Sequence, residues 1–370
     1  MMLFDFRLFF RLTVATATLA SAPVLAAGRW TDKLAAKITV FDGATPRESE
    51  IKLRPDPKMT VFTPEGRREI PFDTPWPTSS TKSGWLAIAA GYRRDNMRFN
   101  IGGKGYPNIL SELEWQTPAT QIRADGGWTH ASGATLKGHL AIAHTFAKGE
   151  NRDSDYALDN RQAEFSRSHA DTTGSEMLDA SLGAGWTLRL GSAATLTPLI
   201  GLARYESIYR SSNGRQVLSD AAAASLLGIA WNVPLGPFDE LHSRYHPIWS
   251  SIWLGLDGEL KAGQRVALRG SLKHHWFTYK AEADWNLRSD LAHPLSFVHK
   301  DSGKGWEAEV GAAIALDKGH QLSIDLSKRS MKTQQGKDTT FFYNGASSTI
   351  DLGEAVLGSW SISLAYRYEF

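Results

Sequence analysis

Two aspartates stand two residues apart in the segment GENRDSDYALDNRQAEFSRSHADTTG, which covers residues 149–174. They are Asp153 and Asp155, and in an extended chain residues in this spacing lie on the same side. Two neighbouring carboxylates shift each other's pKa, so this pair could carry out acid–base chemistry. The alternative is a charged surface loop. The position of the segment in the fold decides between the two.

The composition excludes several classes of protein. The chain has 370 residues and a net charge of +2, which is too balanced for a nucleic-acid-binding surface. It contains no cysteine, so neither disulfides nor thiolate metal sites can form, and we expect no cofactor. No apolar run approaches 18 residues, which excludes a helical membrane span.

The N-terminus has the features of an export signal. Arg7 and Arg11 precede an apolar stretch that closes on the small residues Ala26 and Ala27. This order predicts a secretory signal peptide over residues 1–27. Residues 28–83 are rich in proline and lack a sustained period, which favours a largely irregular periplasmic extension. Two short β-like pieces, KITVF and KMTVF, are the only order that we expect in it.

From residue 84 onward the chain alternates between apolar and polar residues. The segments MLDASLGAGWTLRL, KGWEAEVGAAIAL and SWSISLAYRYEF each place apolar side chains at every second position. A period of two over ten or more residues indicates a β-strand with one apolar and one polar face. A soluble secreted β-protein could show the same pattern, but its strands are usually shorter.

The connections between these segments alternate in length. Tight turns lie near residues 191 and 317, whereas long polar loops are expected at 148–176, 211–245, 280–303 and 335–356. Short turns on one side and long loops on the other are typical of a transmembrane β-barrel. We therefore predict an all-β fold, a ten-stranded antiparallel transmembrane β-barrel over residues 84–370, in a bacterial outer membrane.

The ten strands are expected at about residues 84–95, 107–130, 134–147, 177–190, 194–210, 246–261, 264–280, 304–316, 320–334 and 358–370. An even number places both termini on the periplasmic side. In the second strand, Leu113 and Trp115 are taken as outward. Ile122 and Trp128 have the opposite parity, which predicts a bulge near Pro118.

The polar faces of these strands carry both signs of charge. The expected inward set is Glu112, Glu114, Arg123, Asp125, Lys137, His139, Asp179, Arg189, Asp257, Glu259, Arg269, Lys273, Glu307, Glu309, Asp325, Arg367 and Glu369. A narrow barrel filled with interleaved charges predicts a plugged interior of paired ions rather than a diffusion pore. We assign none of these residues a catalytic role.

At this point the chain resembles the omptins, a family of ten-stranded outer-membrane endoproteases. SELEW at 111–115 is similar to a run in their second strand, and RDSDYALD resembles their Asp-x-Asp-aromatic motif. The resemblance implies that Asp153 and Asp155 hold the attacking water. EADWNLRSD at 282–290 falls where omptins carry Asp-x-His, so Glu282 takes the position of the aspartate and Asp284 that of the histidine.

The missing histidine bears on activity, because peptide hydrolysis at neutral pH needs a base with a pKa near ambient. A site of four carboxylates would have to raise one pKa by mutual repulsion. The segments PNILSELEW, DNRQAEFSRSHADTTG and ADWNLRSDLAHPLSFVHK also resemble the omptin-related Protochlamydia-type outer membrane proteins. That group implies the fold and the location but no chemistry.

The resemblance also implies partners. Omptins bind lipopolysaccharide at the outer rim, and the matching positions are Glu206, Tyr209 and Arg244. The terminal Phe370 resembles the signal that the barrel-assembly machinery recognises. Outer-membrane lipid is a further expected partner, and nucleic acid is not. The oligomeric state stays open.

Three functions remain open at this stage. The first is a structural or surface-binding barrel with a degenerate protease groove. The second is an active endoprotease with an altered dyad, and the third is a substrate-specific channel or an adhesion surface. We expect Asp153 and Asp155 to face the Glu282–Asp284 segment across an outward groove, which requires a bulge in that strand.

Overall fold

The fold was analysed in a computed structural model. It describes residues 84–370 except 103–105 and 318, and the backbone of residues 35–42, 45–52, 58–63 and 66–71. The predicted signal peptide lies outside the described residues. The chain divides into two compact units, Met1–Pro75 and Trp76–Phe370.

The first unit contains more regular structure than the sequence suggested. Strand β1 (Ala35–Asp42) pairs antiparallel with β2 (Thr45–Lys52), and β3 (Lys58–Thr63) pairs with β4 (Gly66–Pro71). The two β-like pieces fall inside β1 and β3, as expected. The expectation of a largely irregular segment missed their partners, β2 and β4, because charged and proline-containing segments carry little strand signal of their own.

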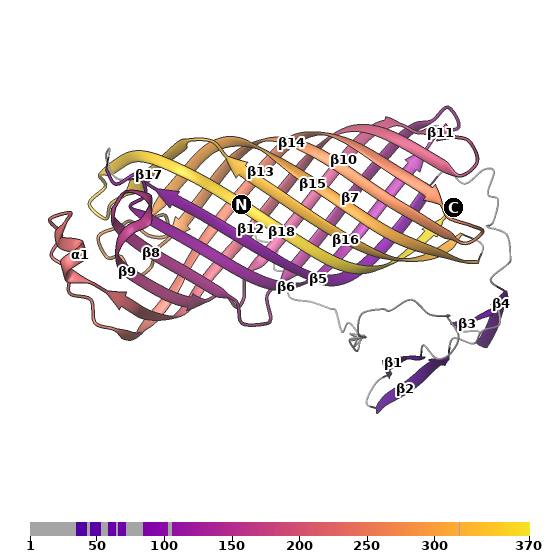
Figure 1. The fold of residues 1–370 in the computed structure, drawn as a ribbon, viewed down its shortest axis with the longest axis horizontal. Helices are drawn as coiled ribbons and strands as arrows, with labels where there is room; N and C mark the ends of the chain where they lie inside the picture. Colours follow the sequence, from indigo (N-terminus) through magenta and orange to yellow (C-terminus); the bar gives the residue numbers. More distant parts are fainter. Residues whose placement is uncertain are drawn as a thin grey trace, which may run out of the picture. The chain divides into compact units, whose positions relative to one another are not determined.

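The second unit is a closed antiparallel barrel of ten strands, as predicted (Figure 1). The strands are β5 (Gly84–Ile101), β6 (Ser111–Thr129), β7 (Ala134–His144), β10 (Glu176–Trp186), β12 (Ala194–Ser219), β13 (Gly236–Lys261), β14 (Val266–Asp284), β15 (Phe297–Asp317), β16 (His320–Thr333) and β18 (Ser347–Glu369). Closure occurs where β10 pairs with both β7 and β12. None of the helices in the described residues is long and apolar enough to span a bilayer.

Four accessory strands extend the sheet. They are β8 (Glu150–Leu158), β9 (Gln162–Asp171), β11 (Leu188–Leu190) and β17 (Gly336–Phe341). The hairpin of β8 and β9 joins β6 to β12, and β17 joins β15 to β18. Much of the long loops expected at 148–176 and 335–356 is therefore strand that is hydrogen-bonded on both sides, whereas residues 220–235 and 285–296 remain outside the strands.

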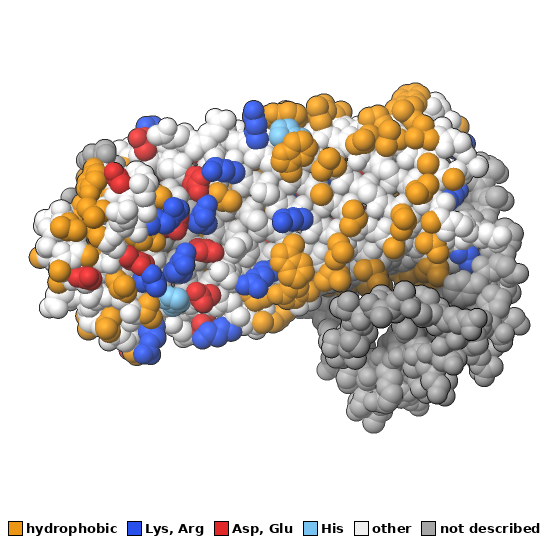
Figure 2. All heavy atoms as spheres, in the orientation of Figure 1, with side chains coloured by type: hydrophobic (Ala, Val, Ile, Leu, Met, Phe, Trp, Pro, Cys, Tyr) orange, Lys and Arg blue, Asp and Glu red, His pale blue; other side chains and the backbone are white. Residues whose placement is uncertain are grey.

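The strands are much longer than a bilayer requires. β12 and β13 have 26 residues each, whereas a tilted membrane-spanning strand needs about 9–11. Exposed aliphatic side chains cover one part of the outside, and Lys, Arg, Asp and Glu cover the other (Figure 2). We call the first part the membrane half and the second the outer half.

Aromatic residues mark the border between the halves. Tyr92 and Trp360 are in ring contact at 5.4 Å, and Trp276 and Trp306 lie on neighbouring strands beside them. Tyr366, Tyr368 and Phe370 line the opposite edge of the membrane half. Such girdles at both interfaces are characteristic of outer-membrane barrels.

The interior changes at the same border. In the membrane half it is filled with paired ions, as the sequence predicted. Arg93 binds Asp95 at 2.7 Å and Asp179 at 2.9 Å, and Arg329 binds Asp179 at 3.0 Å and Glu307 at 2.9 Å. The described interior side chains at this level are thus tied to one another across the barrel.

The outer half is filled with aromatic rings instead. Phe99, Trp115, Tyr245 and Phe297 are buried together, and Trp115 stacks on Tyr245 with a ring separation of 5.1 Å. The Trp115 indole N–H also donates to Ser211 Oγ at 3.1 Å. This core blocks the axis of the barrel above the ion network.

The predicted bulge near Pro118 is wrong. The register between β5 and β6 runs without a shift from Gly84↔Trp128 to Ile101↔Ser111. Leu113 and Trp115 point inward and Ile122 and Trp128 outward, because the apolar face switches where the strand leaves the membrane half. Glu112 and Glu114 consequently have the outward parity and do not belong to the inward set, and Glu112 is buried against Arg98 and Arg161.

Candidate functional site

The aspartate pair lies on β8, in the outer half. Asp153 is paired with Leu113 of β6 and Ser168 of β9, and Asp155 with Ser111 and Ser166. Both aspartates have the parity of Asn151, whose carboxamide accepts a hydrogen bond from the buried Ser211 at 3.0 Å. The two carboxyls therefore face the inside of the barrel, at its outer end.

Both carboxyls lie in surroundings that disfavour ionisation. Removal from water raises the pKa of Asp153 well above its usual range, and the charge of Asp155 raises it further. Burial also raises the pKa of Asp155. Hydrogen bonds from the hydroxyls of Ser111 and Ser166 favour the anion and oppose this increase. Asp153 Oδ1 is buried without a hydrogen-bond partner. The pair therefore favours a shared proton or a nearby cation.

The cation is Arg288, in the loop of residues 285–296 between β14 and β15. Its charge lowers the pKa of both Asp153 and Asp155, in opposition to their burial. The guanidinium is held in place by Asp290, through bonds of 2.8 and 2.7 Å. Thus the segment after β14 acts on the aspartate pair through the charge of Arg288, which is itself ion-paired to Asp290, rather than through Glu282 or Asp284.

Glu282 is directed to the outside. Its carboxylate accepts a hydrogen bond from Lys280 at 2.6 Å, which lowers its pKa. The flanking Ala281 and Ala283 are fully buried on the inner side. Strand β14 thus keeps unbroken alternation through Glu282, so the bulge that would have turned this residue inward is absent.

Asp284 has a histidine partner that the sequence pattern did not reveal. Its Oδ1 lies 2.8 Å from Nδ1 of His293, and Nε2 of that ring lies 3.2 Å from the carbonyl oxygen of Arg288. The bond to Asp284 and the bond to the carbonyl both raise the pKa of His293. Both contacts favour the protonated ring, which donates from both nitrogens and cannot accept a proton.

Neither Arg288 nor His293 could be found from motif spacing. Both lie in an irregular loop that folds back on itself, with Trp285 N donating to Ser296 Oγ at 2.9 Å and Ser296 N donating to the carbonyl of Ala283 at 2.7 Å. The charge-rich string NLRSDLAHP was the available signal. Alternation cannot assign a direction to residues outside a strand.

The three rim residues separate into two groups. Arg244 is exposed on the outside, and Glu206 accepts hydrogen bonds there from Arg204 at 2.8 Å and His246 at 2.8 Å. Burial opposes ionisation of Glu206, but the bonds from His246 and Arg204 keep its pKa below the usual range. Tyr209 is fully buried, and its hydroxyl donates to Asp95 at 3.1 Å. Tyr209 is therefore not available to a lipid.

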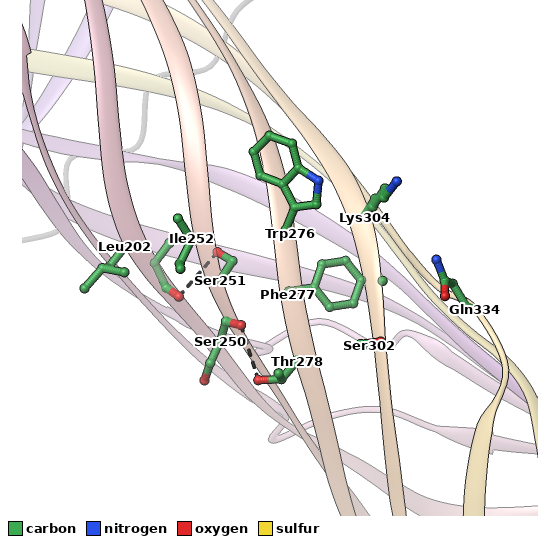
Figure 3. Close-up of a pocket in the computed structure, with 12 residues that line it drawn as sticks. Leu202, Ser250, Ser251, Ile252, Trp276, Phe277, Thr278, Ser302, Lys304 and Gln334 are labelled. Atoms are coloured by element: carbon green, nitrogen blue, oxygen red, sulfur yellow. Dashed lines mark hydrogen bonds between the residues drawn. The ribbon is translucent and has the colours of Figure 1, made fainter.

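A shallow hollow of about 640 Å³ lies on the outside wall, at the border of the two halves (Figure 3). Its floor is a cross-strand row of small side chains, Ser250, Thr278 and Ser302. Trp276 stands on one side of the row, and Lys304 extends beside it. An apolar wall next to an ammonium group suits the junction of an acyl chain and an anionic headgroup.

The described residues contain no group of three or more His, Asp or Glu side chains arranged to hold a metal ion. The chemistry available at the outer end is therefore that of a carboxyl pair, a guanidinium and an aspartate-bound imidazole. Such a set can bind a cation by charge and by hydrogen bonds. In this set the imidazole of His293 is already bonded through both ring nitrogens.

The sequence model of the family described as Protochlamydia outer membrane protein matches residues 87–370. None of the curated proteins matches the chain. Among solved structures, the outer membrane protease OmpT from Escherichia coli superposes with a TM-score of 0.64 at 13% identity, over 79% of this chain and 98% of that one.

Two further barrels match less well. The outer membrane protein OprG from Pseudomonas aeruginosa gives a TM-score of 0.33 at 12% identity, over 78% of this chain and 98% of that one. The translocator domain of the autotransporter NalP from Neisseria meningitidis gives 0.31 at 13% identity, over 80% and 90%. At these identities the likeness to OmpT shows the fold of an outer-membrane barrel, and function has to be argued from the residues.

Proposed function

This chain belongs to the Protochlamydia outer membrane protein family, and from that premise we propose that it is a closed outer-membrane barrel that binds cationic groups at its outer end without cleaving peptides. In this proposal the residues at the positions of the omptin active site form a binding site that lacks a general base. The partner is a Lys or Arg side chain of a surface ligand.

One observation carries the proposal: Arg288 acts on both Asp153 and Asp155. The guanidinium of Arg288 is bonded to Asp290, so its charge reaches the pair without a direct bond, and a ligand cation that bonds the carboxylates would compete with that charge. The exposed side chain of Arg288 is anchored to the equally exposed Asp290. An exposed ion pair of this kind is weak and can be exchanged for another.

The absence of cleavage is inferred from the state of the nearby imidazole. His293 is bonded through both ring nitrogens, to Asp284 and to a backbone carbonyl. Glu282, the other carried-over position, faces the outside wall. The carried-over residues Asp153, Asp155, Glu282 and Asp284 thus provide a carboxyl pair without a free base.

Binding is tested with the refolded full chain and a short Arg-Arg peptide, by calorimetry. We expect Asp153→Asn with Asp155→Asn to abolish binding, and Asp351→Asn, an exposed carboxylate on β18, to leave it unchanged. Arg288→Ala should tighten binding several-fold, because an internal competitor is removed. Weaker binding by Arg288→Ala, or equal binding by the double variant, would refute the proposal.

A second candidate, an endoprotease, is favoured by the contact between Asp284 and His293. A carboxylate that orients an imidazole is the usual arrangement of a base in hydrolases. Cleavage of the same peptide at pH 7.5, lost in both His293→Ala and Asp153→Asn, would establish this function in place of the first. Cleavage that survives in His293→Ala would come from a contaminating protease.

A channel is the least favoured of the three functions, because an ion network and an aromatic core follow one another along the axis. We expect planar-bilayer conductance far below the nanosiemens steps of wide porins. Steady openings of that size would show that the ion network and the aromatic core can both move out of the axis. The proposal of a closed barrel would then be wrong.

We place the lipid partner on the outside wall. Lipopolysaccharide phosphates would meet Arg244 and the Arg204–Glu206 pair, with Lys304 in the hollow beside them. Lys304→Ala with Arg244→Ala should weaken lipopolysaccharide retention in detergent, whereas Lys337→Ala should not. Export by the signal peptide and recognition of Phe370 by the assembly machinery belong to the same proposal. If deletion of Phe370 left assembly unchanged, recognition of Phe370 by the assembly machinery would be refuted.

A further inference from the structure

The longest hairpin of the barrel ends in an uncharged apolar stretch. Between Asp220 and Asp239, residues 221–238 read AAAASLLGIAWNVPLGPF and contain no Lys, Arg, His, Asp or Glu. We call this stretch the tip segment. Leu226, Ile229 and Leu235 in it are 58%, 39% and 64% exposed. Three aliphatic side chains of this segment are therefore left in water.

The tip segment is held rigid by its own contacts. It begins with the short helix α1 (Ala221–Ser225), which Asp220 caps by accepting from the amides of Ala222 and Ala223 at 2.9 and 3.0 Å. Trp231 packs edge-on against Phe165 of β9 at 5.1 Å, and its indole N–H donates to Ser219 at 3.1 Å. The indole of Trp231 is thus engaged by residues of β9 and β12.

The position of the tip segment excludes its own membrane as the cover. It connects β12 and β13, whose outer portions lie beyond the aromatic border, and α1 stands at the end of the barrel opposite to Phe370 (Figure 1). The belt of aliphatic residues covers the part near Phe370, and the charged zone lies between the belt and this end (Figure 2).

We propose that the tip segment inserts its aliphatic side chains into the surface of a second, apposed bilayer with zwitterionic headgroups. Exposed leucine and isoleucine partition favourably into lipid, whereas the anchors of protein interfaces are mainly Trp, Tyr and Arg. Here Trp231 is already engaged by Phe165 and Ser219. Of the exposed charged residues beside the segment, Asp220, Asp239 and Glu240 are acidic and Arg215, paired across from Pro237, is basic, so the net negative charge disfavours anionic lipid.

The absence of cysteine from the chain allows a direct test. The full protein is placed in nanodiscs, so that a lipid disc occupies its own belt, and Leu226→Cys is labelled with an environment-sensitive fluorophore. Phosphatidylcholine vesicles should shift its emission to the blue. Lys337→Cys, whose side chain lies on the outside wall of β17 and is 66% exposed, should show no shift. No shift at 226, or an equal shift at both positions, would overturn the proposal.

Flotation of nanodiscs with vesicles measures the strength of the interaction. The triple variant Leu226→Ser, Ile229→Ser and Leu235→Ser should bind roughly tenfold less, since binding scales with buried apolar area. Tyr343→Ser, which removes a 74% exposed aromatic ring from another outer loop, should bind as the wild type does. Heat-modifiable gel mobility verifies that both variants are folded.

Vesicle composition decides the headgroup class. We expect weaker binding when about a third of the phosphatidylcholine is replaced by phosphatidylserine. Stronger binding to the anionic vesicles, or equal flotation of the triple variant and the wild type, would contradict insertion by the tip segment. Failure of these tests leaves the cation site at Asp153 and Asp155 untouched, because the two proposals share no residue.

Discussion

The membrane half and the outer half of the barrel are built from the same strands with opposite patterns. In the membrane half Leu254 and its neighbours face outward, and Arg93, Asp179 and Arg329 fill the inside. In the outer half Trp115 and Tyr245 fill the inside, and charged side chains cover the outside. The interior is filled in both halves, by ion pairs in the membrane half and by aromatic packing in the outer half.

The difference shows that alternation alone does not say which face is buried. On β6 the outward residues Ile122 and Trp128 meet lipid, and the inward residues Leu113 and Trp115 meet the core. The surroundings of each part determine which face of the strand is apolar. The outward face is apolar where lipid surrounds the barrel, and the inward face is apolar where water does. The change of apparent parity therefore marks the membrane border, not a bulge.

The largest effect is expected from the ion network. Arg329→Ala removes the partner of Asp179 and Glu307, and breaking a buried ion pair on one side costs about 3–5 kcal/mol. Urea unfolding in detergent, read by gel mobility, measures the loss. Lys328→Ala, the exposed neighbour, should stay within about 0.5 kcal/mol. Similar losses in both would mean that the interior ions contribute little to stability.

The lipid face should be the next most sensitive place. Leu254→Arg puts a charge among the lipid-facing residues of β13, at a cost of about 2–4 kcal/mol near the bilayer midplane. The reverse change in the outer half, Lys280→Leu, should alter the free energy of unfolding by no more than about 0.5 kcal/mol. Refolding into liposomes compares the two variants. If Leu254→Arg refolded as well as the wild type, the position assigned to the membrane border would be wrong.

A smaller loss is expected in the aromatic core. Trp115→Phe removes part of a fully buried ring and the indole bond to Ser211, which together are worth about 1–3 kcal/mol. Gln116→Ala on the outer face serves as the control. Unchanged stability of Trp115→Phe would show that the outer half is held by its strand pairing alone.

A pH-dependent change in stability is expected from the aspartate pair. Because the folded pKa of both carboxyls is raised, the native state keeps protons that the unfolded chain releases. Stability therefore falls as the pH rises above about 4. Asp153→Asn should stabilise the protein at pH 7.5 and have little effect at pH 4. Destabilisation at pH 7.5 would mean that the ionised pair is favourable where it lies.

The smallest effect concerns the loop of residues 285–296. His293 has a raised folded pKa, so its contribution is complete below about pH 6.5 and is lost as the pH rises through the folded value. Cleavage by trypsin after Arg288, normalised to a reference peptide, should be about two- to threefold faster at pH 8.5 than at pH 6. In His293→Gln the ratio should be close to one.

Much of the fold followed from the sequence because it depends on local pattern. The long period-two segments and the alternating connections predicted ten strands, and ten strands close the ring. The mixed charges predicted a plugged interior, and ion pairs occupy it. Backbone hydrogen bonding obliges a membrane-spanning sheet to close on itself, so pattern and membrane together leave few alternatives.

Tertiary structure alone decided the direction of each side chain near the membrane border and in the loops. Trp115 and Tyr209 lie inside because water, not lipid, surrounds the wall at that level. The charge of Arg288 acts on Asp153 and Asp155 because the loop after β14 lies at the outer end, and no period encodes such a path. The role of a single charged residue or histidine depends on the side chains that closure of the barrel places near it. Those neighbours are set by distance in three dimensions and not by spacing in the chain.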